Sequence, residues 1–404
     1  MSKPLSLLFV MTDFLGGGIE TILVNYVNAL AQQPDYAVTV VILGALNKNH
    51  QYLAFSPLVP VHHFGVSPRP AKVSKGWQRW VRPLTKGVWL VQSAIAKRSV
   101  RRQLQQLHTQ HAFDVVIDFK SGFSCLIDLF KQWNVLTLTW IHGSYSEYFV
   151  KQQIYERHAI AQYDGVVCLT QRFKTACAID FPDLHDKLSV IYNPLDAESI
   201  VQRSLERASL PPSAQARLDQ PYLVSVARLD KQKDFETLLV GFQQFVHAHP
   251  ASPLQLYLVG EGNHRPVVEA RIHELELTHK VHLLGEQANP SVWMRHAQAV
   301  VLCSVWEGLP TVLIEALCCQ ALIISSDCPD GPDEILAYGA YGVLVPPSDP
   351  KALANVFGQL EAGTLQKPAI VDDVAHTTQR FTTSQSINAF QKLLEKHHKN
   401  SLSR

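Results

Sequence analysis

Short runs that are apolar at almost every position recur along this chain and alternate with amphipathic, helix-like stretches. Residues 5–11 form the first run, and residues 38–43, 114–118, 135–143 and 165–170 form later ones. A strand that is apolar on both faces fits a parallel sheet that is covered by helices on both sides. The alternation therefore predicts an α/β fold built on parallel sheets.

The pattern stops in a polar segment and then starts again. Residues 198–220 are largely polar, and a new series of apolar runs begins at residues 222–227. A chain of 404 residues is too long for one ordinary core and fits two domains of about 200 residues each. We predict two Rossmann-like parallel-sheet domains, residues 1–196 and 197–375, followed by a helical segment, residues 376–404.

Composition and charge indicate a globular protein with no global attraction to nucleic acid. The net charge is +1, and 47% of the residues are hydrophobic, which suits an ample core. The seven cysteines form no CxxC pair and predict reduced core thiols of a cytosolic protein. The apolar N-terminal run predicts a first strand rather than a signal peptide, and no apolar stretch reaches the roughly 18 residues of a membrane span.

One strand, turn and helix unit carries two carboxylates with regular spacing. The strand-like residues 299–304 lead into a turn with Glu307, and an apolar helix follows from Thr311 and contains Glu315. The outward N–H groups of residues 309–312 and the helix dipole favour a negatively charged group, while the carboxylates can accept hydrogen bonds from sugar hydroxyls. The alternative is an ordinary strand–helix unit in which Thr311 is the N-cap and one Glu is buried and satisfied.

A glycine turn follows the first strand. Gly16-Gly17-Gly18 lies between residues 5–11 and a helix that begins near Glu20. Glycine lets backbone N–H groups approach a phosphate because it has no Cβ. The spacing is not the G-x-G-x-x-G pattern of dinucleotide-binding proteins, and a plain glycine turn is the alternative.

Two further turns carry residues that suit phosphate or sugar binding. Arg228 and Lys233 flank the turn after the strand-like residues 222–227, where a guanidinium and an ammonium can hold a diphosphate. Salt bridges to neighbouring Asp230 or Asp234 are the alternative. His142 ends another strand-like run, at the edge where α/β folds bind ligands, although a lone His is more often structural.

Positive charge is concentrated in one segment of the first half. Between residues 36 and 113 there is no Asp or Glu, and residues 69–102 contain ten Lys or Arg together with Trp77, Trp80 and Trp89. This mixture is typical of a surface that binds an anionic bilayer. A solvated loop and helix (residues 90–107) is the alternative, and nucleic acid is a weaker one because no recognition motif accompanies the charge.

Taken together, these elements resemble the retaining glycosyltransferase family 4, which has the GT-B fold: two Rossmann-like domains facing a central cleft. The resemblance is to the bacterial surface-polysaccharide and lipopolysaccharide type. It rests on Gly17-Gly18-Ile19-Glu20, on Arg228 with Lys233, on Val259-Gly260-Glu261-Gly262, on Glu307 with Glu315, and on residues 327–336.

The resemblance implies a role for each candidate residue. Glu307 contacts the hydroxyls of the transferred sugar beside the backbone of Leu309, Pro310, Thr311 and Val312, and Glu315 holds the ribose. Arg228, Lys233 and the amides of Gly17 and Gly18 face the diphosphate. His142 reaches the sugar, the loop after Gly285 meets the nucleobase, and the C-terminal helix crosses back onto the first domain. Glu334 is expected to cap and brace its own loop.

The function that follows is transfer of a hexose or N-acetylhexosamine from a UDP-sugar, with retention, to a lipid-linked or polysaccharide acceptor in bacterial surface-glycan synthesis. No Asp-x-Asp motif occurs, so we expect neither metal nor cofactor. The protein is expected in the cytoplasm, peripherally on the inner membrane through residues 69–102, without a nucleic acid partner. The alternatives are a GT-B epimerase or inverting transferase, and a non-catalytic sugar- or lipid-binding protein.

Overall fold

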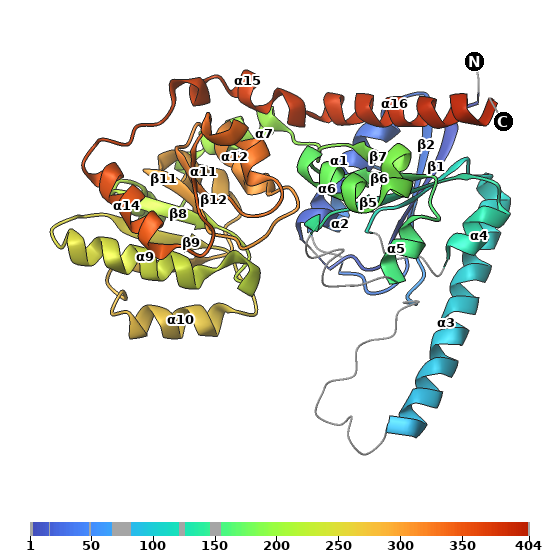
Figure 1. Ribbon diagram of the computed structural model, residues 1–404, viewed down its shortest axis with the longest axis horizontal. Coiled ribbons are helices and arrows are strands. Elements are labelled where there is room, and N and C mark those ends of the chain that lie inside the picture. Colours follow the sequence, from blue (N-terminus) through green and yellow to red (C-terminus); the bar gives the residue numbers. More distant parts are fainter. Residues whose placement is uncertain are drawn as a thin grey trace.

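The computed structural model describes residues 3–15, 17–47, 50–66, 82–120, 126–145 and 155–402. Two parallel sheets, each flanked by helices, form two domains that lie side by side (Figure 1). The α/β class and the GT-B architecture predicted from the sequence are confirmed.

The first sheet has seven strands within the described residues, in the order β3-β2-β1-β4-β5-β6-β7. Its strands are β1 (Leu5–Met11), β2 (Tyr36–Ile42), β3 (Val61–His63), β4 (Val115–Asp118), β5 (Leu136–Ile141), β6 (Gly165–Cys168) and β7 (Leu188–Val190). Its helices are α1 (Gly18–Ala31), α2 (His50–Leu53), α3 (Arg82–His111), α4 (Ile127–Gln132), α5 (Tyr155–Ile160) and α6 (Gln171–Asp180).

The second sheet has six strands in the segment 155–402, in the order β10-β9-β8-β11-β12-β13. Its strands are β8 (Tyr222–Val226), β9 (Gln255–Val259), β10 (Val281–Gly285), β11 (Ala299–Leu302), β12 (Ile323–Ser326) and β13 (Val343–Val345). The helices of this half are α7 (Ala197–Ser204), α8 (Pro212–Leu218), α9 (Phe235–Ala248), α10 (Arg265–Glu274), α11 (Pro290–His296), α12 (Thr311–Cys318), α13 (Pro332–Ile335), α14 (Pro350–Glu361), α15 (Val374–Thr378) and α16 (Thr383–Leu402).

Strand order reverses at one point in each sheet. In the first sheet β1 lies between β2 and β4, and in the second β8 lies between β9 and β11. Parallel α/β sheets bind ligands beyond the carboxyl ends of the strands at such reversal points. The turn at Gly17, the turn at Arg228 and the turn at Glu307 follow β1, β8 and β11, so the topology places all three predicted turns at reversal points.

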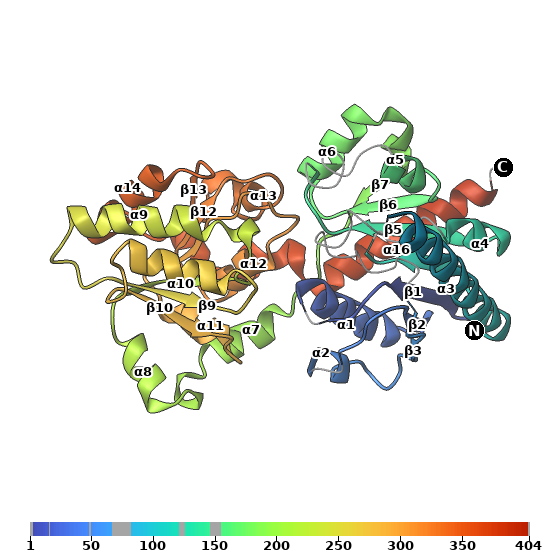
Figure 2. The same ribbon diagram turned by 90° about the horizontal axis from the view of Figure 1, so that it is seen from below.

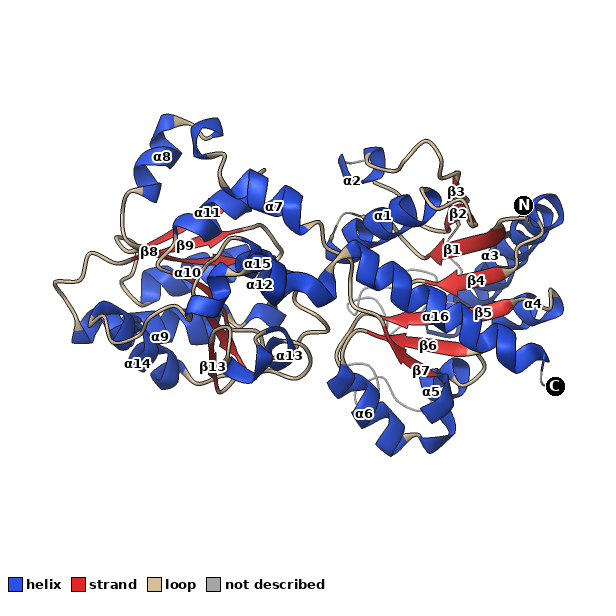
Figure 3. Ribbon diagram, turned by 90° about the horizontal axis from the view of Figure 1, so that it is seen from above, coloured by secondary structure: helices blue, strands red, loops and turns tan. Residues whose placement is uncertain are grey.

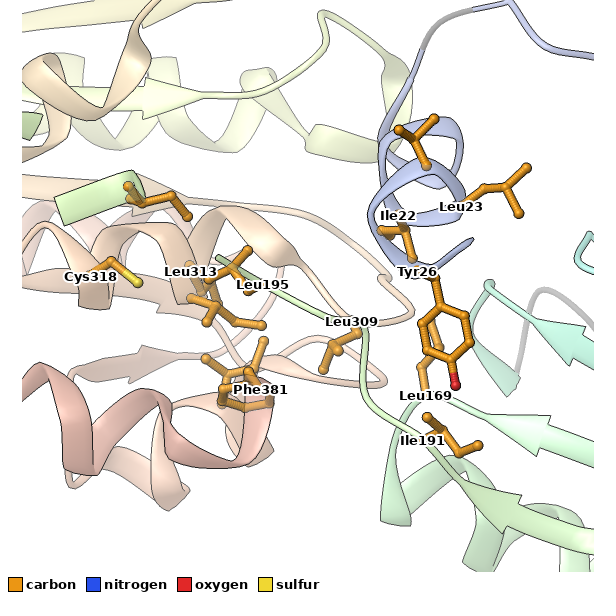
Figure 4. Close-up of a cluster of buried hydrophobic side chains, with 14 of the residues drawn as sticks. Ile22, Leu23, Tyr26, Leu169, Ile191, Leu195, Leu309, Leu313, Cys318 and Phe381 are labelled. Atoms are coloured by element: carbon orange, nitrogen blue, oxygen red, sulfur yellow. The ribbon is translucent and has the colours of Figure 1, made fainter. Parts of the chain in front are cut away.

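One hydrophobic core continues from the first domain into the second. Tyr26 on α1, Leu195 on the connection, Leu309 on the turn after β11 and Phe381 before α16 belong to the same buried cluster (Figure 4). The last helix, α16, returns to the first domain and packs against α1 (Figures 2 and 3). On it, fully buried Phe390 packs edge-to-face against Tyr26, with ring centroids 5.9 Å apart.

The segment between β2 and β4 departs most from the sequence prediction. It contains the short strand β3, which the sequence did not predict, and the predicted helix at residues 90–107 is part of the longer α3. The polar boundary at residues 198–220 is not irregular either, because α7 and α8 lie in it. The polar composition of this segment did not predict α7, because α7 buries only a few side chains.

Candidate functional site

Glu307 is held by three side chains on the turn after β11 and the turn after β8. Its Oε1 accepts hydrogen bonds from Lys233 Nζ and Ser304 Oγ, each at 2.5 Å, and its Oε2 accepts one from Gln232 Nε2 at 3.4 Å. The Glu307 and Lys233 side chains are 8% and 16% exposed. A carboxylate with this many partners has a fixed position, and its remaining lone pairs can accept from ligand hydroxyls.

Helix α12 begins directly after this turn. Pro310 is its N-cap, Leu313 N donates to Pro310 O at 3.0 Å, and no side-chain cap or acidic first-turn residue accompanies the helix start. The alternative interpretation of this strand–helix unit, in which Thr311 is the N-cap, is therefore wrong. The first-turn N–H groups and the helix dipole are left to attract an anionic or hydroxyl-rich ligand, as predicted for residues 309–312.

Arg228 and Lys233 lie on the same turn but have different partners. Arg228 Nη2 is 3.1 Å from Asp230 Oδ2, and the two side chains are 66% and 45% exposed. An exposed pair contributes little to stability, so Arg228 can exchange Asp230 for a ligand phosphate. Arg228 therefore forms the salt bridge of the alternative interpretation, and its guanidinium is still within reach of a ligand.

A hollow of about 850 Å³ opens beside this turn, and its walls belong to the second domain alone. Arg228, Gln232, Phe235, His264, Arg271 and Trp306 are among the residues that line it. Gly260 and Gly262 after β9 allow the neighbouring turns to pack, because an added Cβ at either would lie 2.1 or 2.2 Å from the carbonyl oxygen of Ala227 or Leu229. These glycines are thus required by the close backbone contact.

The glycine turn after β1 opens onto the N-terminus of α1. Gly17 is the N-cap of α1, and an added Cβ at Gly18 would meet nothing within 4 Å among the described residues. Glu20 in the first turn of α1 is buried and lies 3.4 Å from Lys120 Nζ. The turn therefore has room for a ligand at Gly18, and the sequence did not identify Lys120 as a neighbour.

His142 directly follows β5, at the carboxyl edge of the first sheet. Its ring packs on Phe119, with centroids 4.7 Å apart, and burial lowers its pKa to about 3, against a small opposing effect of the Phe119 backbone. The ring is thus neutral near pH 7. Both ring nitrogens are buried, and neither has a hydrogen-bond partner of ordinary geometry among the described residues.

His142 meets the Glu307 turn across the domain boundary. An added Cβ on Gly308 would lie only 2.2 Å from the carbonyl oxygen of His142. The structure therefore brings His142, Glu307 and Lys233 together, although they come from three separate turns. This approach depends on glycine at position 308, because any side chain there would separate the two turns.

Among the described residues, neither Glu315 nor Gly285 is hydrogen-bonded to His142, Glu307 or Lys233. Burial raises the pKa of Glu315, while Arg203 on α7 and the Thr311 hydroxyl oppose that rise. Within the described residues no hydrogen bond joins Glu315 to Glu307. Gly285 ends β10 with φ of +69°, and its position beside Glu261 suits the predicted base-facing loop. The sequence did not indicate Arg203, because only the fold brings α7 beside α12.

Glu334 braces the two domains rather than its own loop. Its Oε2 accepts from the Gln171 backbone N–H at 2.9 Å, and its Oε1 accepts from the Tyr192 hydroxyl. Both donors precede the second domain in the chain, so the expected partners within residues 327–336 were wrong. Asp330, which the sequence analysis did not single out, makes a similar contact to Tyr145 N at 2.6 Å.

The predicted membrane-facing stretch is only partly described. Trp77 and Trp80 lie outside the described residues. Helix α3 extends away from the first sheet (Figure 1). Among its described side chains, Val100, Leu104 and Leu107 are buried, whereas Arg98 and Arg102 are exposed. None of the described helices is long and apolar enough to cross a bilayer.

Comparison with known proteins matches both domains. The family model "Glycosyltransferase Family 4" matches residues 16–199, and "Glycosyl transferases group 1" matches residues 206–373. HepE from Anabaena, solved in complex with UDP and glucose, has a TM-score of 0.72 and 18% sequence identity over 97% of this chain and 100% of HepE. At that identity the likeness shows the fold alone.

Two curated relatives are similar over part of their length. An undecaprenol-linked 4-alpha-N-acetylgalactosaminyltransferase of Campylobacter jejuni is 33% identical over 39% of this chain and 40% of the relative. The lipopolysaccharide 1,6-galactosyltransferase of Salmonella typhimurium is 28% identical over 40% of this chain and 42% of the relative. The chain spans about half the length of the curated relatives it matches. With two consecutive family models matching the two halves of a GT-B fold, the chain belongs to glycosyltransferase family 4.

Proposed function

We propose that this protein transfers a hexose or N-acetylhexosamine from a UDP-sugar to a lipid-linked or oligosaccharide acceptor of bacterial surface glycan, with retention of configuration. The observation that carries this proposal is the fixed Glu307 carboxylate, which is bound to Lys233 and precedes the start of α12, on a turn whose Gly308 lies against the His142 carbonyl across the domain boundary. The carboxylate can accept hydrogen bonds from sugar hydroxyls, and the cation and the helix N–H groups attract a diphosphate. Together they suit a sugar diphosphate.

Each residue has a role in the proposed reaction. Negative charge develops on the β-phosphate as the sugar leaves, and fixed cations and N–H groups stabilise it. Arg228, Lys233 and the amides of Gly17 and Gly18 supply them. Glu307 and the backbone of residues 309–312 orient the sugar, while Glu315 holds the ribose and the loop after Gly285 faces the base.

His142 acts in this proposal as a neutral hydrogen-bonding group. Because burial lowers its pKa to about 3, the ring is neutral near pH 7 and is not a general acid, but its one N–H can donate a hydrogen bond to a sugar oxygen. Glu307 is engaged with Lys233 and Ser304, which disfavours it as a covalent nucleophile. Attack on the same face, assisted by the departing phosphate and without a metal, fits this set of residues.

The acceptor class is supported by the names of the relatives. One relative acts on a diphospho-undecaprenol glycan and another is a lipopolysaccharide galactosyltransferase, so lipid-linked or lipopolysaccharide glycans are the proposed acceptors. The exposed cations of α3 support peripheral attachment to an anionic cytoplasmic membrane face, through residues 69–102. We propose a cytoplasmic, membrane-attached enzyme.

A ligand panel tests the proposed donor. Thermal unfolding is measured with UDP, GDP, ADP and their sugars, on the wild type, on Glu315→Ala and on the exposed control Glu361→Ala. A ligand at about a hundred times its Kd adds roughly 2.7 kcal/mol of stability. We expect stabilisation by uridine nucleotides alone, lost in Glu315→Ala and kept in the control.

Two other outcomes would change the proposal. Stabilisation by GDP or ADP instead of UDP would replace the donor class. No stabilisation by any nucleotide would favour the non-catalytic sugar- or lipid-binding alternative. Anomer analysis of the product by NMR then distinguishes retention from inversion once a sugar donor is known.

A further inference from the structure

One acidic loop of the second domain makes a series of contacts with the first. This acidic loop, residues 327–336, comprises the connection after β12 and helix α13, and it contains Asp330, Asp333 and Glu334. Asp330 Oδ2 accepts from Tyr145 N at 2.6 Å, Asp333 Oδ2 pairs with Arg172 Nη1 at 3.1 Å, and Glu334 Oε2 accepts from Gln171 N at 2.9 Å. All three carboxylates thus have partners across the domain boundary.

Two of these carboxylates are buried and the third is peripheral. Asp330 and Glu334 are 2% and 5% exposed, whereas the Arg172 side chain that pairs with Asp333 is 47% exposed. Burying a carboxylate is costly unless hydrogen bonds replace water. Gln171 is the first residue of α6, so the negative charge of Glu334 lies at the positive end of a helix dipole. The buried contacts of Asp330 and Glu334 are therefore more specific than the exposed contact of Asp333.

The same loop also supports the Glu307 turn. The Glu307 backbone N–H donates to Pro329 O at 3.0 Å. Gly331, with φ of +105°, lies so close to the turn that an added Cβ would be 2.6 Å from Pro310 Cδ and 3.1 Å from Gly308 O. On one side the loop thus carries the turn that holds Glu307, and on the other it holds Tyr145.

Tyr145 is three residues beyond His142, on the loop that follows β5. The acidic loop therefore links the two walls of the proposed site: one end fixes the loop of His142, and the other fixes the turn of Glu307. Burial raises the pKa of Asp330, and the hydrogen bond from the Tyr145 N–H opposes that rise.

We propose that Asp330 and Glu334 are positioning residues for the transfer reaction: Asp330 holds the His142 loop, Glu334 holds the start of α6, and together they keep the first domain in register with the Glu307 turn. This inference rests on the proposed function for its kinetic consequence. Neither side chain needs to touch the donor, and because most of the proposed UDP contacts lie in the second domain, we expect UDP binding to depend little on them.

The test uses Asp330→Gly, Glu334→Ala and the double variant. Glycine adopts the positive φ of Asp330 without strain, and alanine suits helix α13, so each change removes the carboxylate with little backbone cost. Asp327→Ala is the matched control, because this carboxylate is on the same loop and exposed. Tyr192→Phe removes only the hydroxyl that donates to Glu334, and it replaces the double variant in the test if the double variant does not fold.

Spin labels report the domain arrangement independently of activity. Leu58→Cys in the first domain and Val267→Cys in the second carry the labels, since both side chains are exposed, and the described native cysteines are buried. We expect the distance distribution to broaden in the double variant and in Tyr192→Phe but not in the control. A distribution identical to wild type in all variants contradicts the inference.

Kinetics separate positioning from binding. The readouts are the Kd for UDP by calorimetry and the rate of sugar release to water from whichever UDP-sugar the wild type hydrolyses. We expect hydrolysis to fall at least tenfold in the double variant while the Kd for UDP changes less than threefold. Equal losses of both would assign a structural role instead. If the wild type does not bind UDP, the proposed function fails, whereas the label distances still decide the inference.

Discussion

At the scale of single residues, the central feature is the pair of Lys233 and Glu307. Each was predicted to face the ligand, and the structure shows that each is also the partner of the other. A lysine bound to a buried carboxylate is held in place before a phosphate arrives, which reduces the cost of ordering it on binding. Ser304 and Gln232 complete the arrangement, and they act through Glu307.

We expect Lys233→Met to lower both stability and activity. Removing the cation leaves the buried Glu307 with two weaker partners, and breaking a largely buried pair costs about 1–3 kcal/mol. For a domain of this size that corresponds to a fall in Tm of roughly 3–10 °C. The control Lys367→Met breaks the more exposed pair with Asp372 and is expected to change Tm by less than about 2 °C. Equal shifts in the two variants would contradict the assignment.

The raised pKa of Glu315 predicts how UDP affinity depends on pH. Burial raises its pKa in the free protein, and ribose hydroxyls donate best to the ionised carboxylate. UDP should therefore bind more weakly as pH falls through the raised pKa, and binding near that pKa should release protons. The contribution of this group to the stability of the free protein has the opposite sign: it declines as pH rises above the unfolded pKa towards the raised one.

Calorimetry in two buffers of different ionisation enthalpy measures the proton release. The variant Glu315→Gln should bind UDP more weakly and lose this part of the pH dependence. An unchanged pH profile in that variant would show that another group is responsible.

At the scale of elements, turns decide how the two sheets meet. Gly308 lets the turn after β11 touch the carbonyl of His142, and Gly331 lets the acidic loop pack beneath that turn. Helices contribute differently: α12 offers its N-terminus and α3 offers exposed cations.

We expect Gly308→Ala to separate the domains without unfolding them. Its Cβ would lie 2.2 Å from His142 O, and a backbone oxygen cannot move aside cheaply. Gly143→Ala is the control on the opposite wall, because its Cβ would meet nothing within 4 Å among the described residues. Small-angle scattering should show a larger radius of gyration for Gly308→Ala only, with Tm changed by a few degrees at most.

Charge reversal on α3 tests membrane attachment. Each cation near an anionic surface contributes about 1 kcal/mol, so Arg98→Glu with Arg102→Glu should weaken binding to phosphatidylglycerol vesicles by at least about thirtyfold. The control, Lys351→Glu with Lys392→Glu, makes the same net change on exposed or half-exposed positions elsewhere. Equal weakening by both pairs would indicate attraction by overall charge rather than by α3.

At the scale of the whole molecule, the C-terminal helix belongs to the first domain although it follows the second. Phe390 on α16 is fully buried among Tyr26, Tyr36 and Trp140. The chain therefore crosses between the domains twice, which limits how far they can move apart.

We expect Phe390→Ala to destabilise the first domain. Truncating a fully buried Phe costs about 3–5 kcal/mol, and urea unfolding followed by tryptophan fluorescence measures the loss. Tyr338→Ala, at a side chain that is 79% exposed, should change little. An equal effect of both variants would place α16 outside the cooperative unit of the first domain.

The apolar runs of the sequence predicted the α/β class and the two parallel sheets, because a strand covered on both faces must be apolar at every position and this pattern is local. The same is true of the turns at Gly17, Arg228 and Glu307, whose place after apolar strands locates them at the edge of a parallel sheet. The GT-B fold was predicted from the resemblance of the motifs to a known family.

The tertiary structure decided which of these residues touch. The pair of Lys233 and Glu307 joins residues 74 positions apart, and the contact of Asp330 with Tyr145 joins residues 185 positions apart. The burial that makes His142 neutral likewise depends on how β5 and its neighbours pack. Such contacts leave no periodic trace in the sequence, because they arise only when separate turns meet at the carboxyl edges of two sheets.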